Sequence, residues 1–355
     1  MRGQPTKNAP DLLFPRDEGR HVDALHEWWY LNSHLETNTG RHYGLFVLFF
    51  PNSMYLTLVD KLGKYVVKRI VSYETVKTST SHLNLETGNS WWRQVPGRPF
   101  HYAMHLHEDD LSLSLDLLPR KPPLFVNHSG CIREGLLGTS KYYALTNMKV
   151  SGTLQLNQNE FDVRGIGWID RQWGSWDFGG IGSWDWFSIQ LSNNVEILVA
   201  QILHPITTRP TMRTFNMMDN EGRTKVYDKF RVECLKTWKS PRTGSVYGVE
   251  WKVSLPQDTN LLISPVFEDQ EIHGGLWEGC CEVKGILHGQ RVNGVCYAEH
   301  FYNLWNYFAR ANYFRLISLG TAPLHYIGQR LLGRVDFNVW RLLFSILRKL
   351  RARAG

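Results

Sequence analysis

The chain has 355 residues, 43% of them hydrophobic and 21% charged, so it can bury a large core in one or two globular domains. Its net charge is +7, but residues 303–355 hold nine Lys or Arg and one acid, which leaves residues 1–302 close to neutral. The body therefore excludes a basic nucleic-acid-binding surface, and no nucleic-acid partner is expected.

The cysteines and the N-terminal segment bear on the cellular compartment. The five cysteines are odd in number and show no CxxC spacing, which argues against a disulfide framework and a zinc site. Residues 1–20 are polar and contain several prolines, and we expect them to form a loose lead-in without a secretory signal. No run of about 18 apolar residues occurs, so no membrane-spanning helix is expected. The expected location is the cytoplasm.

The sequence from Glu27 to about Tyr302 is typical of β-strands almost throughout. Short runs rich in β-branched and aromatic residues alternate with turn signals such as Thr39-Gly40 and Asn193-Asn194. Many short strands at near-regular spacing predict an all-β fold of barrels or sandwiches. The expected strands are 43–50, 65–72, 100–106, 111–118, 142–145, 150–156, 161–169, 184–191, 196–203, 229–238, 246–255, 276–286 and 291–302.

A break in this pattern falls near residue 205, where Pro205 and Pro210 interrupt the strand-rich sequence. Because proline cannot continue a paired strand, the break predicts a domain boundary. The expected domains are 21–205 and 206–302.

Residues 303–355 form a predicted basic amphipathic helical tail. Within 337–351, apolar side chains recur at helical spacing on one wide face, and Arg341, Arg348 and Lys349 lie opposite. Such a helix can lie in a bilayer interface, so we expect residues 337–351 to contact a membrane surface, on the inner face of a membrane. A helix packed on the strand-rich body is the alternative.

Carboxyl groups stand among tryptophans at two places far apart in the sequence. Glu27 directly precedes two tryptophans, and Asp170 lies between Trp168 and Trp173. An ionised carboxylate in apolar surroundings is costly unless it is paired. The pattern predicts an enclosed apolar cavity with a few polar groups, whose ligand would be a hydrophobic small molecule.

Asp185 is the first candidate for a catalytic acid, and Asp170 is the second. Side chains alternate along a strand, so Asp185 shares an apolar face with Phe187 and Ile189. Burial disfavours the charged form of a carboxyl group, so we expect Asp185 to have a raised pKa and to protonate an alkene. A structural role, in which Asp185 caps backbone amides or pairs with an arginine, is the alternative.

The other candidates have a structural alternative as well. Glu27 and Arg171 either line the site or form a buried ion pair that fixes the register of two strands. The aromatic residues either stabilise a carbocation by cation–π attraction or belong to the core, and a ligand-facing role is expected for two or three of them. The expected substrate-binding aromatics are Trp29, Tyr30, Trp168, Trp173, Trp184 and Trp186. No metal-binding motif is complete, so no metal site is expected.

An ordered series of motifs resembles a known family. The series spans residues 14–302 and is similar to the lipocalin-like proteins that include carotenoid 1,2-hydratase and the AttH-type proteins. The last motifs of the series resemble the final hairpin of the family, and they add Trp277 and Glu278 to the expected substrate-binding residues. Many AttH-type members carry His where this chain has Arg171, and a guanidinium does not give up a proton at working pH. The matching segments are 14–17, 27–30, 43–44, 121–124, 142–146, 150–154, 167–174, 184–187, 277–279, 283–285 and 294–299.

The resemblance implies two tandem lipocalin-like β-barrel domains, a ligand pocket in or between them, and no metal or organic cofactor. It leads to three hypotheses. The first is an enzyme that binds a polyene or terpenoid and hydrates or cyclises it with the help of an acid. The second is a pericyclase that holds a polyene for a [4+2] cyclisation. The third is a lipid-binding protein without catalysis, since fold analogy alone does not choose among these.

Overall fold

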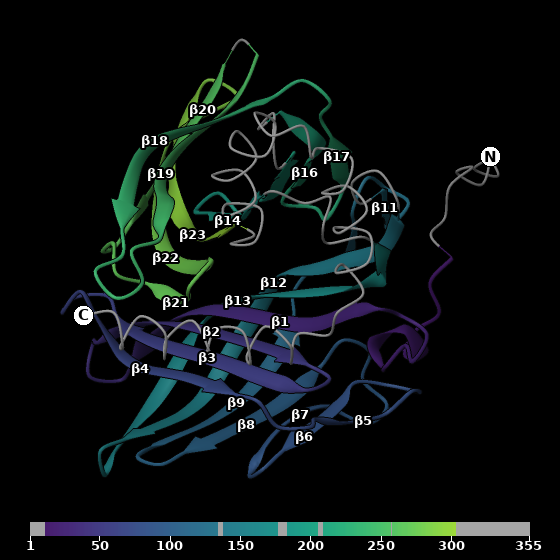
Figure 1. Ribbon diagram of the computed structural model, residues 1–355, viewed down its shortest axis with the longest axis vertical. Helices are drawn as coiled ribbons and strands as arrows, with labels where there is room; N and C mark the ends of the chain where they lie inside the picture. The colour runs from purple at the N-terminus through teal and green to yellow at the C-terminus, as the bar shows by residue number, and fades with distance from the viewer. Residues whose placement is uncertain (1–10, 134–137, 177–182, 205–208, 257, 303–355) are drawn as a thin grey trace, which may run out of the picture.

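The computed structural model describes residues 11–133, 138–176, 183–204, 209–256 and 258–302, and strands dominate them (Figure 1). The one helical element in these ranges is the short 3-10 helix η1 (Arg16–Glu18). No helix among the described residues has the length and apolar character needed to cross a bilayer. The predicted helix 337–351 and its membrane contact lie outside the described residues.

The strands form two antiparallel sheets that curl separately, and Figure 1 shows the second sheet above the first. The first sheet has 13 strands. Its strand order is β4 (Tyr65–Ser72), β3 (Ser53–Asp60), β2 (His42–Phe50), β1 (His26–Thr37), β13 (Asn159–Trp176), β12 (Gly138–Leu156), β9 (Leu111–Pro119), β8 (Tyr102–Glu108), β7 (Ser90–Gln94), β6 (Asn84–Thr87) and β5 (Lys77–Thr78), with β10 (Leu124–Phe125) and β11 (Cys131–Arg133) on β12.

The second sheet has 10 strands. Its order is β17 (Thr224–Val226), β16 (Pro210–Met218), β15 (Glu196–Leu203), β14 (Ser183–Leu191), β23 (Gln290–Tyr302), β22 (Leu276–Leu287), β20 (Thr259–Pro265), β19 (Val246–Leu255) and β18 (Arg231–Lys239), with β21 (Glu271–His273) on β22. The prediction of an all-β fold with two tandem lipocalin-like units is confirmed.

The chain passes from one sheet to the other between Trp176 and Ser183, which does not coincide with the predicted boundary near residue 205. The strands β14 and β15 lie before that boundary, yet they pair within the second sheet. Pro210 is the first residue of β16, which pairs with β15 in the same sheet, and Pro205 lies outside the described residues. Pro210 therefore does not end the sheet, because proline is tolerated at the first residue of a strand.

The predicted strands agree well where one face is buried. The ranges predicted for β4, β15 and β19 match the structure at both ends. The two runs 142–145 and 150–156 belong to one strand, β12, which continues through a register shift between Leu145 and Met148. The strand β3 was not predicted, because every residue in it is buried and no polar–apolar alternation marks it.

Alternation along β1 divides the interior into layers. Trp29 and Leu31 point into the core enclosed by the first sheet, whereas Tyr30 and Asn32 point toward the second sheet. A second core fills the curl of the other sheet, and a third apolar cluster joins the two sheets. The face of the strand on which a candidate side chain lies therefore decides which of these three apolar clusters surrounds it.

Candidate active site

Asp170 lies in the layer between the two sheets, on β13, opposite Tyr30 of β1. Its side chain accepts hydrogen bonds from the Tyr142 hydroxyl on Oδ2 and from Trp168 Nε1 on Oδ1, the latter at 2.8 Å. The indole of Trp186, from the second sheet, donates to the Tyr142 hydroxyl at 2.7 Å. Burial raises the pKa of Asp170 to about 7, although the two hydrogen bonds act in the opposite direction.

Two more carboxyl groups enter the same layer from the second sheet. Glu278 and Glu299 face each other across β22 and β23; Glu278 is buried and Glu299 is partly buried. Tyr30 donates to Glu278 Oε2 at 3.2 Å, and Trp184 Nε1 donates to Glu299 Oε1. Burial and the charge of Glu299 raise the pKa of Glu278 well above its ordinary value, and burial raises the pKa of Glu299. Two adjacent buried carboxyl groups cannot both ionise cheaply, so the pair holds a proton near neutral pH.

We call Asp170, Glu278, Glu299 and their tyrosine and tryptophan donors the seam cluster. It brings together Asp170, Tyr30, Trp168, Trp184, Trp186 and Glu278 from the expected site residues. Glu299 and Tyr142 were missed. Glu299 stands in an ordinary strand sequence after Tyr297 and Ala298, and only its register opposite Glu278 reveals its role.

Asp185 lies elsewhere, on the inner face of the second sheet. Its Oδ1 is 2.6 Å from Nδ1 of His300 on β23, and Gln201 Nε2 donates to its Oδ2 at 2.7 Å. The Asp185 side chain is 7% exposed and that of His300 is 16% exposed. The structural partner of Asp185 is therefore a histidine, whereas the sequence suggested backbone amides or an arginine. Trp277 lies on the same side of the second sheet, packed in its core.

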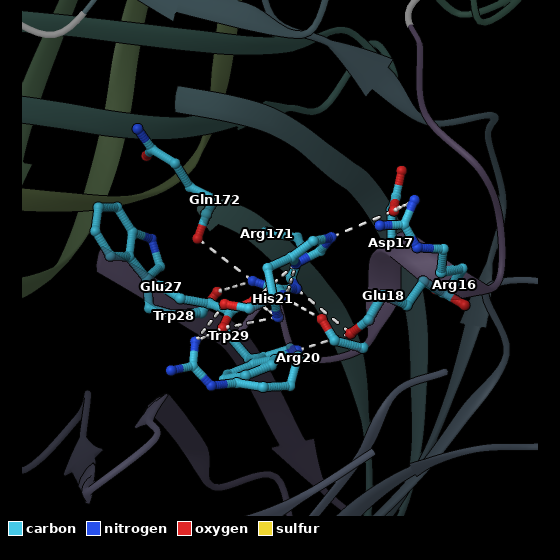
Figure 2. Close-up of polar contacts among 11 residues, drawn as sticks. Arg16, Asp17, Glu18, Arg20, His21, Glu27, Trp28, Trp29, Arg171 and Gln172 are labelled. Atoms are coloured by element: carbon cyan, nitrogen blue, oxygen red, sulfur yellow. Dashed lines mark hydrogen bonds and ion pairs between the residues drawn. The ribbon is translucent and has the colours of Figure 1, made fainter. Parts of the chain in front are cut away.

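Glu27 and Arg171 form the buried ion pair that was one of the two predictions for them (Figure 2). Arg20 and His21 also bind the Glu27 carboxylate. Burial alone would raise the pKa of Glu27, but the hydrogen bonds and charges of His21, Arg171 and Arg20 lower it to about 2. The Arg171 guanidinium carbon lies 4.1 Å from the centre of the Trp29 ring, a cation–π contact.

This ion network lies on the opposite face of β13 from Asp170. Arg171 and Trp173 point into the core of the first sheet, while Asp170 points to the seam. Arg171 therefore does not pair with Asp170, because neighbouring residues of a strand face opposite ways. The lead-in residues around η1 complete the network, since Arg171 also donates to the backbone carbonyls of Glu18 and Gly19.

Most of the expected pocket aromatics are packed in the core. Trp29, Trp168 and Trp277 are at most 1% exposed. Described side chains also bury the carboxyl groups of Asp170 and Glu278, which are 3% and 1% exposed. A core tryptophan and a pocket-lining tryptophan have the same sequence signature, which is why the pattern could not separate them.

The pockets on the described part of the molecule include two open ones, with volumes of about 480 Å³ and about 670 Å³. The larger lies at the mouth of the first sheet and is bordered by Arg20, His21 and Trp173. The smaller has a strongly basic lining. Neither pocket is bordered by Asp170 or Asp185. Within the described ranges, no three His, Cys, Asp or Glu side chains are grouped to ligate a metal ion.

Comparison with known proteins gives one family and several similar structures. The AttH-like family model matches residues 55–300. A solved structure from Nitrosomonas europaea, provisionally assigned as AttH, is 24% identical with a TM-score of 0.71, over 85% of this chain and 100% of that chain. Kievitone hydratase from Nectria haematococca is 18% identical with a TM-score of 0.70, over 84% of this chain and 95% of its own.

A structure of CghA with Sch210972 is 10% identical with a TM-score of 0.46, over 83% of this chain and 97% of its own. No curated protein sequence matches the chain significantly. The first two likenesses establish a shared fold.

Proposed function

Because the chain belongs to the AttH-like family, we propose that it is a cofactor-independent enzyme that hydrates or cyclises an alkene by proton transfer. The proton donor in this proposal is Asp170 of the seam cluster. The substrate class is a hydrophobic polyene or terpenoid. The name of one structural relative, kievitone hydratase, is in keeping with addition of water to a carbon–carbon double bond.

The observation that carries the proposal is the state of the Asp170 carboxyl group. A pKa of about 7 leaves a large fraction of the group protonated at neutral pH. An aspartic acid in water, with a pKa near 3.8, would be almost wholly ionised at that pH and could not donate. Asp170 is thus the better candidate acid, in place of Asp185, whose carboxyl group is paired with the imidazole of His300.

The proposed reaction begins when the Asp170 hydroxyl gives its proton to one alkene carbon, which leaves a carbocation on the other carbon and a carboxylate on Asp170. The faces of Trp168 and Trp186, whose ring centres are 6.2 Å apart, can stabilise the cation. A water molecule then adds to the cation and loses a proton, or an internal double bond attacks it and a proton is lost from carbon. Asp170 regains a proton in either case.

A hydrophobic substrate would approach Asp170 past partly buried side chains at the edge of the layer between the two sheets. Trp28, Trp184 and Met212 are partly exposed and pack against the same apolar cluster as Trp186. Side chains of this kind can part to admit a flexible hydrocarbon chain, and they would exclude bulk water around the cation. The charge of nearby Glu299 disfavours a second negative charge in this layer, which favours the protonated form of Asp170.

The test uses the full chain and a panel of acyclic polyenes and terpenoids in deuterium oxide, with products analysed by mass spectrometry. Acid-assisted hydration adds the mass of one water, and acid-assisted cyclisation gives an isomer of the substrate; both place one deuterium on carbon. Asp170→Asn should reduce turnover at least about 100-fold, in the range of lost general acids. Asp185→Asn is the matched control and should keep most of the turnover.

The two other functions give different results in the same assay. A pericyclase would form its product without taking up deuterium, and Asp170→Asn would leave the turnover nearly normal. A lipid-binding protein would quench its own tryptophan fluorescence on binding a polyene but release it unchanged. Either result would refute proton transfer from Asp170.

A further inference from the structure

A basic pocket lies away from the carboxyl groups of the seam cluster, at the other end of the layer between the two sheets. It is formed by the C-terminal end of β1, the neighbouring parts of β2, β12 and β13, and Val295 of β23. Its volume of about 480 Å³ falls within the range of small-molecule sites. We propose that this pocket binds a phosphate or diphosphate group carried on a small, partly apolar molecule.

The charge of the lining points to an anion. Lys61, Arg120, Lys149 and Arg164 border the pocket, and Glu36 is the one acid that does so. Glu36 pairs with Arg164 at 3.3 Å. Lys61, Arg120 and Lys149 make no ion pair with any residue that the structure describes. Three positive charges that surround one concavity without a protein partner create a strong attraction for a polyvalent oxyanion.

The buried histidine of the pocket provides a second, independent observation. His34 is 7% exposed, and its Nε2 atom has no hydrogen-bond partner among the described residues. Its other nitrogen, Nδ1, lies 3.6 Å from the Sγ atom of Cys280. When that thiol donates to Nδ1, the neutral ring carries its proton on Nε2, where it can be donated to an oxyanion. A buried polar atom without a partner is unusual and indicates a missing ligand.

The packing behind His34 fixes the ring in this position. Gly44 lies opposite His34 on β2, and a Cβ atom there would come within 2.7 Å of both Cys280 Sγ and the Tyr297 hydroxyl. The absence of a side chain lets these two residues of the second sheet reach His34, whose ring centre is 5.3 Å from that of Tyr297. The pocket is therefore built from both sheets and does not depend on mobile surface side chains alone.

The rest of the lining suggests what carries the phosphate. Ile166 and Val295 contribute partly exposed apolar surface beside the cations. A bare phosphate ion would leave that surface in contact with water. An organic phosphate with an apolar portion would cover it and use both parts of the site.

Inorganic pyrophosphate is the first probe, titrated into the full chain at low salt. The readout is the side-chain nitrogen resonances of the protein labelled with nitrogen-15 histidine, with His34 identified by the signal that His34→Phe removes. We expect the His34 Nε2 resonance to shift in a saturable way. This signal is local, so binding of pyrophosphate to the basic residues 303–355 does not produce it.

Charge reversal tests whether the pocket cations hold the anion. The double variant Arg120→Glu/Lys149→Glu changes two exposed residues and should raise the dissociation constant at least about tenfold. The control Lys239→Glu/Lys252→Glu makes the same charge change on exposed residues of the second sheet and should alter it less than twofold. No shift of His34, or equal weakening in both double variants, would overturn the proposal.

Short-chain phosphatidic acid, used below its micelle concentration, distinguishes the source of the phosphate. If it shifts the His34 signal at lower concentration than pyrophosphate does, the site takes a lipid phosphate. If pyrophosphate is at least as effective, the site takes the phosphate or diphosphate of a water-soluble molecule.

Discussion

Asp185 and His300 form a close pair on the inner face of the second sheet, with 2.6 Å between Asp185 Oδ1 and His300 Nδ1. Gln201 donates to the other carboxyl oxygen, so both oxygens are engaged. A group that is held in this way orients and stabilises its neighbours. Its distance from the seam cluster follows from the alternation of strand β14, on which Asp185 and Trp186 face opposite sides.

We expect Asp185→Asn to affect stability more than turnover. The amide cannot accept from both partners as the carboxylate does, so the free energy of unfolding should fall by about 1–3 kcal/mol. Urea unfolding of the two proteins measures this difference, and steady-state turnover should stay within about threefold of the wild type. A large loss of turnover in this variant, with normal turnover in Asp170→Asn, would make Asp185 the acid.

The turnover of the enzyme should fall as the pH rises through the pKa of Asp170. Burial raises that pKa to about 7, and only the protonated carboxyl group can donate. The value of kcat/KM should be level below about pH 6 and fall about tenfold per pH unit well above 7. A pH–rate profile measures this dependence. A profile that rises from pH 6 to 8 would show that the ionised form of a group is needed.

The Asp170 carboxyl group should also make the free energy of unfolding depend on pH. Between its ordinary pKa of 3.8 and about 7, the folded protein binds this proton more tightly than the unfolded chain does. Its favourable contribution is complete below 3.8 and is lost as the pH rises through 7. Asp170→Asn removes this dependence, so the variant should gain stability relative to the wild type between pH 4 and 8, by an amount on the order of a few kcal/mol.

The Glu27–Arg171 pair should be more costly to break than to replace. Arg171→Met leaves the Glu27 carboxylate buried with fewer partners, so we expect a loss of about 3–5 kcal/mol in the free energy of unfolding. The double variant Glu27→Met/Arg171→Met should recover part of that loss. Urea unfolding of the single and double variants gives the coupling energy, and a double variant that loses the full sum would argue against a direct pair.

This pair also predicts acid sensitivity. The folded-state pKa of Glu27 is lowered to about 2 from an ordinary 4.5. Its contribution to stability is therefore complete above pH 4.5 and is lost as the pH falls toward 2. Glu27→Gln should flatten the stability curve in this acid range, in contrast to Asp170→Asn, whose effect is seen between pH 4 and 8.

The tail 303–355 remains a prediction from sequence, and vesicle binding tests it. Residues 337–351 should bind vesicles that contain anionic lipid, with each nearby Lys or Arg contributing about 1 kcal/mol. Arg341→Glu/Arg348→Glu should weaken sedimentation with such vesicles at least about tenfold. Lys239→Glu/Lys252→Glu is the control. Equal binding of all three proteins would mean that the tail is not the membrane contact.

The strand predictions succeeded where burial is one-sided and failed where it is not. β15 and β19 were located to the residue, since their ends coincide with turn signals. β3 is buried on both faces and β12 carries an irregularity in its middle, and neither feature leaves a clear pattern in sequence. Local sequence marks where chain direction changes, but it does not identify the partner of a strand, which is why the change of sheet between β13 and β14 went unseen.

The site predictions divide in a similar way. The Glu27–Arg171 ion pair was among the expected outcomes. Glu299 and His300 were missed, because each acquires its role only through a partner far away in sequence. Three carboxyl groups become a cluster only when two sheets close over them.

The sequence by itself determined that this protein is built of β-strands, that it carries the AttH-like motifs, and that Asp185 shares a strand face with Phe187 and Ile189. These properties follow from local side-chain alternation and turn chemistry. Only the tertiary structure decided that Asp170 lies near Glu278 and Glu299 in the layer between the two sheets, while Asp185 pairs with His300. Burial and the neighbours brought by other strands set the protonation of a carboxyl group, and both arise from contacts between residues that are distant in the chain.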